Sequence, residues 1–334
     1  MSANDEPVLE VEDLRTHFHT PRGAVRAVDG VSLRLVAGET LGLVGESGSG
    51  KSVLGRTLMG LVTSDATTTV TGAVRVAGRS VHEMSSRERR RLWGPQVAMV
   101  FQDPMTSLNP VRTIGAHLTD PLRLHVRLGR KEAANRAVEL LDRVGIPDPK
   151  RRLRQYPHEL SGGMRQRVMI AVALSCDPEV LVADEPTTAL DVTVQKQILD
   201  LVAELAAERR MATILISHDL GAIEGRTDRV AVMYAGRVVE RAATLDLFAT
   251  PHHPYAEALI ASVPELTNPP HTLLRAIEGQ PPDMANPPAG CRFAPRCARR
   301  TDRCVDEEPL LVAAGSGHRA VACHLPVGLT EEAV

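Results

Sequence analysis

Apolar positions near the start of the chain follow first the two-residue period of strands and then the longer period of a helix. Residues 8–11 and 31–35 alternate apolar and polar side chains, which predicts two strands separated by a turn at 21–23. Residues 40–44 form a compact apolar run, and a glycine-rich segment then leads into a helical pattern over 51–61. The pattern therefore predicts two strands followed by a strand–loop–helix unit.

Strand and helix patterns continue to alternate further along the chain. A hairpin-like stretch over 70–76 turns at 77–79 and leads into a charged segment at 85–91. The pattern is helical over 113–144 and stops at 145–147, where glycine and proline occur together. Two further helices and two buried strands follow in alternation, at 165–174, 180–183, 194–208 and 212–217. This order predicts an α/β fold with a mostly parallel sheet covered by helices.

The composition changes after about residue 263. Paired prolines at 269–270, 281–282 and 287–288 interrupt any periodic pattern, and four of the five cysteines follow them. We therefore expect two parts, a main domain over 1–263 and a C-terminal extension over 264–334.

Charge and composition exclude several classes of function. Lys and Arg total 39 and Asp and Glu total 41 in 334 residues, so the formal net charge of −2 argues against a polycation that coats nucleic acid. Aromatic residues make up 2 %, too few for a platform on which single-stranded bases stack. No window approaches 18 consecutive apolar residues, and the acidic N-terminus lacks the pattern of a secretory signal. We expect a cytosolic protein without direct membrane insertion and without a nucleic-acid partner.

Residues 45–52, GESGSGKS, match the phosphate-binding pattern G-x4-G-K-[ST] between a predicted strand and a predicted helix. Glycines let the backbone turn its N–H groups toward phosphates, and the helix N-terminus adds its positive dipole end. Lys51 is expected to reach the β- and γ-phosphates of ATP, and Ser52 to give a hydroxyl to Mg²⁺. The other predicted ATP-binding residues of this loop are Gly45, Ser47, Gly48 and Gly50.

Two further segments fit nucleotide chemistry. A buried strand ends in Asp184 and Glu185, which places Asp184 to hold Mg²⁺ and Glu185 to polarise the attacking water. At residues 161–163 a helix begins with Ser-Gly-Gly, where a serine N-cap and free N–H groups favour a second phosphate contact.

The C-terminal cysteines form a candidate metal centre. Cys291, Cys297, Cys304 and Cys323 supply four thiolates, enough for a closed tetrahedral site or for an iron–sulfur cluster. Their spacings of five and six residues differ from the tight pairs of zinc ribbons and favour a 4Fe–4S cluster. His318 and His324 lie close by and keep Zn²⁺ as the alternative. Cys176 is expected to be a small buried residue.

Together these motifs resemble the nucleotide-binding subunit of ATP-binding-cassette (ABC) transporters. The resemblance rests on the phosphate loop, the signature at 160–166, the Asp184–Glu185 strand end, and the segments 188–191 and 217–219. It extends to Gln102, which matches the Q-loop of that family. It implies a P-loop NTPase (RecA-like) core with an antiparallel β subdomain, an inserted α-helical signature subdomain at about 103–176, and a small Cys-rich extension.

The resemblance also implies how the site works. Two cassettes pair head to tail, so that Ser161, Gly162 and Gly163 contact the γ-phosphate held by the partner. Asp191 links the two sites. Glu185, His218 and Lys51 are the expected catalytic residues, and Ser52, Gln102 and Asp184 the expected Mg²⁺ residues. Phe18 and His19 are the candidates for stacking on adenine, with a core position as the alternative for Phe18.

Three segments point to a branch of the family. Residues 101–110, 251–255 and 290–297 are similar to sequences of oligopeptide and dipeptide importers, most like the D-type ATPase subunit. That branch implies an ATPase powering peptide import at the cytoplasmic face of a bacterial membrane. Its partners are a second ATPase subunit, two membrane permease subunits and an extracytoplasmic solute-binding protein. The branch also implies a 4Fe–4S cluster at the four cysteines.

Two alternatives accompany this interpretation. A nickel or oligosaccharide importer would carry the same ATPase subunit. A soluble ABC ATPase acting on nucleic acid or ribosomes is the more distant alternative. Such proteins usually have two cassettes per chain or a basic face, whereas this chain has one phosphate loop, one signature and a balanced charge. A nucleotide fold without activity is disfavoured because Lys51, Asp184, Glu185 and His218 are all present.

Overall fold

The chain forms two compact units, each built from segments that are distant in sequence. A computed structural model describes residues 6–103, 107–187, 191–263, 277–315 and 319–329. The helical unit comprises residues 1–10, 34–39 and 74–216. The phosphate-loop unit comprises residues 11–33, 40–73 and 217–334. The boundary expected at 264 falls in the segment 264–276, which lies outside the described residues.

Four strands near the N-terminus form one sheet. Their order in the sheet is β2-β1-β4-β5, with β1 at Pro7–Thr20, β2 at Gly23–Val36, β4 at Thr68–Val76 and β5 at Arg79–Ser80. Sequence periodicity predicted only short strands at 8–11 and 31–35, whereas β1 and β2 span 14 residues each. The outer parts of these strands are half-exposed and carry no strict alternation. Hydrogen bonding to neighbouring strands is a long-range property that the local pattern does not contain.

The phosphate-loop unit is built on the strands β3 (Thr40–Val44), β9 (Arg229–Tyr234) and β10 (Arg237–Ala243). β3 and β9 are parallel, with Leu41 opposite Arg229, and β9 pairs with β10 in the antiparallel sense. The C-terminal strands β12 (Ala320–Val321) and β11 (Val312–Ala313) then extend the edge at β10. The helices of this unit are α1 (Lys51–Leu58), η3 (Leu220–Ala222), α9 (Thr244–Ala249), α10 (Pro254–Ala261), η4 (Ala294–Arg296) and α11 (Asp302–Asp306). Residues 312–321, near the C-terminus, are thus joined to the edge strand β10 of the phosphate-loop unit.

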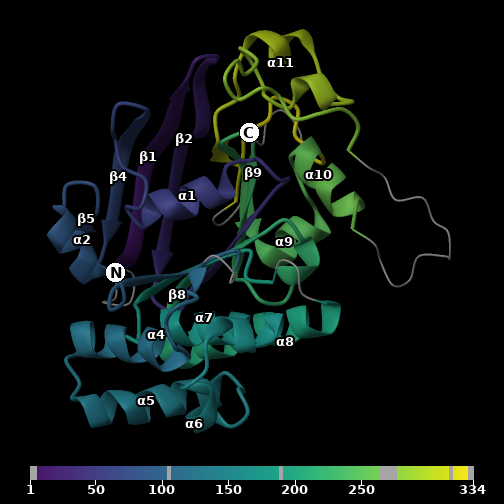
Figure 1. Cartoon of the computed structure of the whole chain (residues 1–334). Coiled ribbons are helices and arrows are strands. Elements are labelled where there is room, and N and C mark those ends of the chain that lie inside the picture. Colours follow the sequence, from purple (N-terminus) through teal and green to yellow (C-terminus); the bar gives the residue numbers. More distant parts are fainter. Residues whose placement is uncertain (1–5, 104–106, 188–190, 264–276, 316–318, 330–334) are drawn as a thin grey trace. The chain divides into compact units, whose positions relative to one another are not determined.

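The helical unit contains three parallel strands, β6 (Val97–Val100), β7 (Val180–Asp184) and β8 (Ala212–Ser217). Every residue of these strands is buried, as expected when helices cover both faces of a parallel sheet. The helices, seen in Figure 1, are α2 (Ser86–Leu92), α4 (Ile114–Pro121), η1 (Leu122–Val126), α5 (Arg130–Arg143), α6 (Pro149–Arg152), η2 (Pro157–Glu159), α7 (Gly162–Ala173) and α8 (Val192–Arg209). The predicted α/β class is confirmed.

The helical unit also differs from the sequence prediction in two places. The pattern over 113–144 predicted continuous helix, but the chain passes from α4 into a π-helical turn and breaks at Arg127, whose φ is 62°. The new helix α5 begins at Arg130, and the N–H of its N-cap residue Gly129 donates to Glu132 Oε2 at 2.9 Å. The charged segment 85–91 forms helix α2, where Ser85 and Glu88 make a reciprocal capping box.

None of the helices in the described part of the chain has both the length and the apolar character needed to cross a bilayer.

Candidate functional site

The phosphate loop joins β3 to α1 within the phosphate-loop unit, as the motif requires. Two of its glycines have no room for a side chain. A Cβ at Gly45 would lie 2.1 Å from the carbonyl oxygen of Met233, and one at Gly50 would lie 2.0 Å from that of Ala27. Gly50 also has a φ of 103°, a backbone conformation that side chains disfavour. The sequence therefore folds into a tight loop at this position because glycine alone fits.

Lys51 and its neighbours occupy the expected places on the loop and the first turn of α1. The buried ammonium of Lys51 donates to the carbonyl oxygens of Gly45 at 2.7 Å and Glu46 at 2.9 Å. Ser52 follows it on the first turn of the helix and is half-buried, whereas Ser47 and Gly48 are exposed. Exposed backbone N–H groups at a helix N-terminus are suited to bind an anion.

In the helical unit, Gln102 and Glu185 are brought together from positions 83 residues apart. Gln102 Nε2 donates to Glu185 Oε2 at 2.8 Å. Glu185 follows β7 with a φ of 45°, and its N–H donates to the carbonyl of Ile216 at 3.0 Å. Asp184, the last residue of β7, is fully buried. An amide that donates to a carboxylate oxygen fixes the orientation of that carboxylate.

The signature residues cap the start of α7. Ser161 is the N-cap and accepts a hydrogen bond from the N–H of Met164 at 3.3 Å, as predicted. Ser161 and Gly162 are exposed, and a Cβ at Gly163 would lie 3.1 Å from Val194 Cγ1. Ser161 and its neighbours therefore present free backbone groups at a helix start.

Asp191 is the N-cap of the neighbouring helix α8. Its side chain accepts from the N–H of Val194 at 2.9 Å, the residue that also packs on Gly163. The signature and Asp191 are thus close together in the helical unit. The remaining residues of the motif that ends at Asp191, 188–190, lie outside the described part of the chain.

His218 lies directly after β8 and is exposed. The N–H of Asp219 donates to Ser217 Oγ at 2.9 Å, which fixes the backbone beside it. Of the two adenine candidates, His19 is exposed and its Nε2 lies 2.7 Å from Thr69 Oγ1, and Phe18 is only half-buried and not part of the core.

The predicted site residues accordingly form two groups. The phosphate-loop unit carries the loop and His218, and the helical unit carries Gln102, the signature, the Asp184–Glu185 pair and Asp191.

The four C-terminal cysteines line one small cavity, together with His324. Burial is the main factor that raises the pKa of Cys323, to about 12, and it also raises the pKa values of Cys291 and Cys297. Within the described residues, no three His, Cys, Asp or Glu side chains gather closely enough to hold a single metal ion. His318 lies outside those residues.

Cys176 is buried in the helical unit, where burial raises the pKa of its thiol. The prediction of a small buried residue is confirmed.

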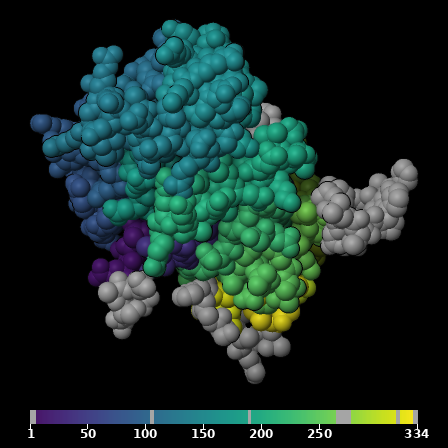
Figure 2. All heavy atoms as spheres, turned by 90° about the horizontal axis from the view of Figure 1, so that it is seen from below, coloured from purple at the N-terminus to yellow at the C-terminus, as the bar shows by residue number. Residues whose placement is uncertain are grey.

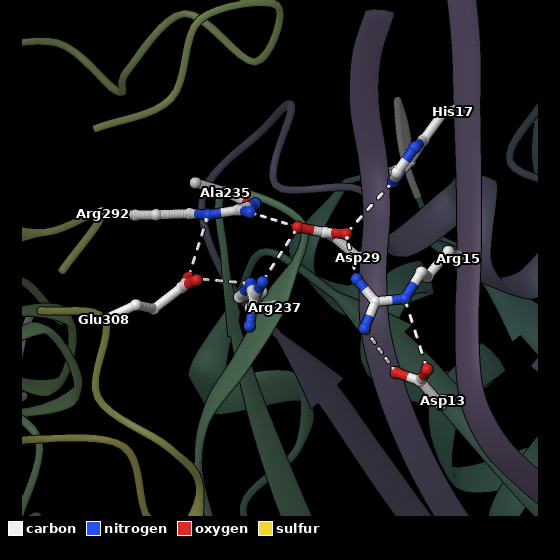
Figure 3. A network of polar contacts seen from close by, with 8 residues as sticks. All are labelled: Asp13, Arg15, His17, Asp29, Ala235, Arg237, Arg292 and Glu308. Carbon is white, nitrogen blue, oxygen red and sulfur yellow. Dashed lines mark hydrogen bonds and ion pairs between the residues drawn. The ribbon is translucent and has the colours of Figure 1, made fainter. Parts of the chain in front are cut away.

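The phosphate-loop unit contains a buried carboxylate, Asp29, that accepts hydrogen bonds from several cationic side chains. Figure 3 shows Asp29 between Arg292 and Arg237 on one side and Arg15 and His17 on the other. Arg15 Nη1 donates to Asp29 at 2.9 Å and Arg237 Nη2 at 3.1 Å. Burial disfavours the charged form of Asp29, but Arg292 and Arg237 outweigh this effect and the pKa falls from 3.8 to about 2.

Comparison with known proteins places the chain in a family. A family model described as "ABC transporter" matches residues 28–188. Oligopeptide transport ATP-binding protein AppD of Bacillus subtilis is 47% identical over 95% of this chain and 96% of its own length. Oligopeptide transport ATP-binding protein OppD of Salmonella typhimurium is 48% identical over 96% of this chain and 94% of its own. This chain belongs to the ABC transporter ATP-binding family.

The ABC fold of this chain is also found in a solved structure, the dimeric post-hydrolysis state of the ATP-binding cassette MJ0796 bound to ADP and Pi. That likeness has a TM-score of 0.64 at 25% identity and covers 71% of this chain and 98% of that one. A second family model, "Oligopeptide/dipeptide transporter, C-terminal region", matches residues 239–304. The resemblance stated from the motifs and the P-loop NTPase fold class are confirmed.

The sequence motifs of this ABC ATPase did not reveal two side chains that hold the phosphate loop, those of Arg296 and Tyr255. Arg296 Nη1 and Nη2 donate to the two carboxylate oxygens of Glu46, and the Tyr255 hydroxyl accepts from the N–H of Glu46. These contacts join positions 209 and 250 residues apart, so no local pattern could have indicated them.

Proposed function

We propose that this ABC ATPase hydrolyses ATP to power the import of oligopeptides or dipeptides across the cytoplasmic membrane. The observation that carries the proposal is the match of residues 239–304 to the C-terminal region of oligopeptide/dipeptide transporters, on the same chain as the ABC match. Relatives over nearly the whole chain are named for oligopeptide transport, which supports the same substrate class. Nickel or oligosaccharides would be the cargo of related importers, and no contact in the described residues favours them.

We propose the following roles for the phosphate-loop unit. Backbone N–H groups of the loop bind the phosphates of ATP, and Lys51 neutralises charge on them. Ser52 gives its hydroxyl to Mg²⁺, which spreads the negative charge that develops during phosphoryl transfer. His218 acts on the γ-phosphate. The tight loop and the buried Lys51 support these roles.

We propose matching roles for the helical unit. Asp184 and Gln102 hold Mg²⁺, and Glu185 orients and polarises the attacking water. The hydrogen bond from Gln102 to Glu185 supports this assignment, because it fixes the carboxylate on which the water would depend.

We propose that the ATPase acts as a head-to-tail pair with a second ATPase subunit. In such a pair Ser161, Gly162 and Gly163 bind the γ-phosphate held by the partner, and Asp191 links the two sites. The exposure of Ser161 and Gly162 at a helix start supports binding to a group outside this chain. The dimeric structure of the cassette MJ0796 supports the pairing of two cassettes.

We propose that the helical unit docks on two membrane permease subunits, which receive peptide from an extracytoplasmic binding protein. Large apolar side chains of this unit are exposed: Val111 at 80 %, Leu124 at 73 %, Val126 at 44 %, Tyr156 at 39 % and, on α8, Val192 at 83 %. Figure 2 shows the surface of the chain from one side, with residues of this unit in blue and teal. Large apolar side chains that a subunit leaves exposed are candidates for burial against a partner protein. This docking would hold the subunit peripherally at the cytoplasmic face.

We also propose a 4Fe–4S cluster at Cys291, Cys297, Cys304 and Cys323. All four line one cavity, which supports a shared ligand set. Within the described residues no three such side chains gather closely enough to hold a single metal ion, so the support for a cluster is the shared cavity and the number of thiolates. When bound, the cluster supplies covalent cross-links that brace this small C-terminal part. Metal and sulfide analysis of anaerobically purified protein tests it, and iron-free protein with one zinc would contradict it.

The change Glu185→Gln tests the ATPase mechanism. We expect the variant to bind ATP with unchanged affinity, to lose turnover by at least about a hundredfold, and to accumulate as a closed dimer. Glu204→Gln, on an exposed position of α8, is the matched control and should hydrolyse ATP normally. Normal hydrolysis by the Glu185 variant would remove this residue from the base role.

A further inference from the structure

Arg296 links the cysteine-bearing segment to the phosphate loop. Its Nη1 donates to Glu46 Oε2 at 2.6 Å and its Nη2 to Glu46 Oε1 at 3.0 Å, a bidentate ion pair. Glu46 is the second residue of the phosphate loop, and Arg296 lies next to Cys297. The Arg296 side chain is 3 % exposed and that of Glu46 is 26 % exposed, so water and salt screen this pair less than they screen a pair on the open surface.

The remaining donors of Arg296 are also all used. Its Nε donates to the carbonyl of Glu278 at 2.9 Å, and its Nη groups donate to the carbonyl of Ile277 at 3.0 Å and to Tyr234 Oη at 3.4 Å. With the two bonds to Glu46, the five N–H groups of the guanidinium have five partners. A guanidinium bonded on every side has little freedom to move, and it can therefore fix the position of Glu46.

A cluster of aromatic rings supports the same contact. The Tyr255 hydroxyl accepts from the N–H of Glu46 at 2.8 Å. The ring of Tyr255 lies 4.5 Å from that of Tyr234 and 5.4 Å from that of Phe293, measured between centroids. Phe293 precedes Arg296 by three residues, so the same segment supplies both the guanidinium and part of the cluster. Glu46 is thus held at its carboxylate and at its peptide N–H.

A second arginine of this segment, Arg292, is connected to the phosphate loop through a chain of hydrogen bonds. Arg292 donates to the carbonyl of Ala235 at 2.5 Å and to the carboxylate of Asp29. Asp29 N–H donates to the carbonyl of Gly236 at 2.9 Å, and Gly236 N–H donates to that of Ser49, also at 2.9 Å. Ser49 belongs to the phosphate loop. The segment between Cys291 and Cys297 therefore reaches the loop by two routes.

We propose that Arg296 is a positioning residue of the ATPase, which holds Glu46 and so keeps the phosphate loop in the shape that binds ATP. The carbonyl of Glu46 accepts from Lys51 Nζ at 2.9 Å, so displacement of Glu46 also changes the position of that ammonium. The cysteine-bearing segment is then part of the nucleotide site. This inference rests on the proposed function, since it requires that the loop binds ATP.

A double-mutant cycle on the full chain tests the proposal. ATP affinity, kcat and KM are measured for the wild type, Arg296→Ala, Glu46→Ala and the double variant. We expect each single change to weaken ATP affinity and raise KM about tenfold with little change in kcat, and the double variant to be no weaker than either single one. Arg300→Ala, an exposed arginine of the same segment, is the control and should keep wild-type affinity. Arg296→Lys, which retains the charge but loses the fork, should recover part of the affinity.

Two results would overturn the proposal. If Arg296→Ala lowers the melting temperature but leaves ATP affinity unchanged well below it, Arg296 has only a structural role. If the effects of the two single changes multiply in the double variant, the residues act independently. Should Arg296→Ala fail to fold, Glu46→Gln keeps the shape of the side chain and should weaken affinity in the same direction, and unchanged affinity there refutes the role. A wild type that binds no ATP would instead contradict the proposed function itself.

Discussion

Replacing Asp29 by asparagine tests how much the ion pairs of this buried carboxylate stabilise the phosphate-loop unit. Asp29 is 1 % exposed and accepts from Arg15, Arg237, Arg292 and His17. The asparagine has nearly the same shape but no charge, and its amide group brings donors toward other donors. The Arg292 guanidinium, which is buried, then loses its closest carboxylate.

The magnitude follows from the structure in two ways. Breaking a buried ion pair by removing one partner costs about 3–5 kcal/mol, because the other charge is left uncompensated. The charge of Asp29 alone contributes about 2 kcal/mol at pH 7, since its pKa is lowered from 3.8 to about 2 and each pH unit corresponds to 1.36 kcal/mol. The variant should therefore lose at least about 2 kcal/mol of its free energy of unfolding.

The dependence on pH has a definite sign. Because the pKa of Asp29 is lower in the folded state, its contribution is complete above about pH 4 and is lost as the pH falls toward 2. Urea unfolding, followed by circular dichroism at pH 7 and pH 3, measures the difference in free energy of unfolding between the wild type and Asp29→Asn at each pH. The difference in free energy of unfolding should narrow by about 1 kcal/mol at pH 3.

Asp13→Asn is the matched control. Asp13 pairs with Arg15 but its side chain is 67 % exposed, so its loss should change the free energy of unfolding by less than about 1 kcal/mol. Equal effects of the two substitutions, or a difference for Asp29→Asn that stays constant from pH 7 to pH 3, would refute the reasoning.

Two other substitutions have expected outcomes set by geometry. Gly50→Ala should lower both the melting temperature and the ATP affinity, because the added Cβ would lie 2.0 Å from a carbonyl oxygen. In the control Gly48→Ala the added Cβ meets no atom within 4 Å, so this variant should lose only about 1 kcal/mol through backbone strain. Equal melting temperatures of the two variants would contradict this reasoning. Glu240→Gln should lower the melting temperature by roughly 5 °C or more, because the fully buried carboxylate accepts from Arg319 and from two backbone N–H groups. An unchanged melting temperature of this variant would mean that the contacts of Glu240 add nothing to stability.

Local sequence signals predicted the parts of this fold in which neighbouring residues determine the structure. The strand at 212–217 and the start of the helix at Lys51 agree with the structure, because a continuous apolar run and a glycine-led helix start are visible within a few residues. Ser161 was recognised as an N-cap for the same reason. The break at Arg127 was missed, because the single glycine that follows at 129 is compatible with a continuous helical pattern, whereas the chain leaves that pattern in a π-helical turn.

Contacts between distant segments could not be predicted in this way. Glu46 and Arg296 are 250 residues apart, and neither has a local pattern that names the other. Gln102 was expected near the site only through its family resemblance, and its hydrogen bond to Glu185 depends on the pairing of β6 with β7. The sequence motifs predicted which residues carry the chemistry, whereas long-range packing determines which other side chains hold those residues in place.

The proposal that this chain powers a peptide importer is tested most directly by what it binds in the membrane. The tagged full chain is recovered from membranes solubilised in mild detergent, and the proteins that co-purify are identified by mass spectrometry. We expect two multi-span membrane proteins, a second ATPase and an extracytoplasmic binding protein that carries peptide. Recovery only from the soluble fraction, alone or with ribosomes or nucleic acid, would contradict the importer.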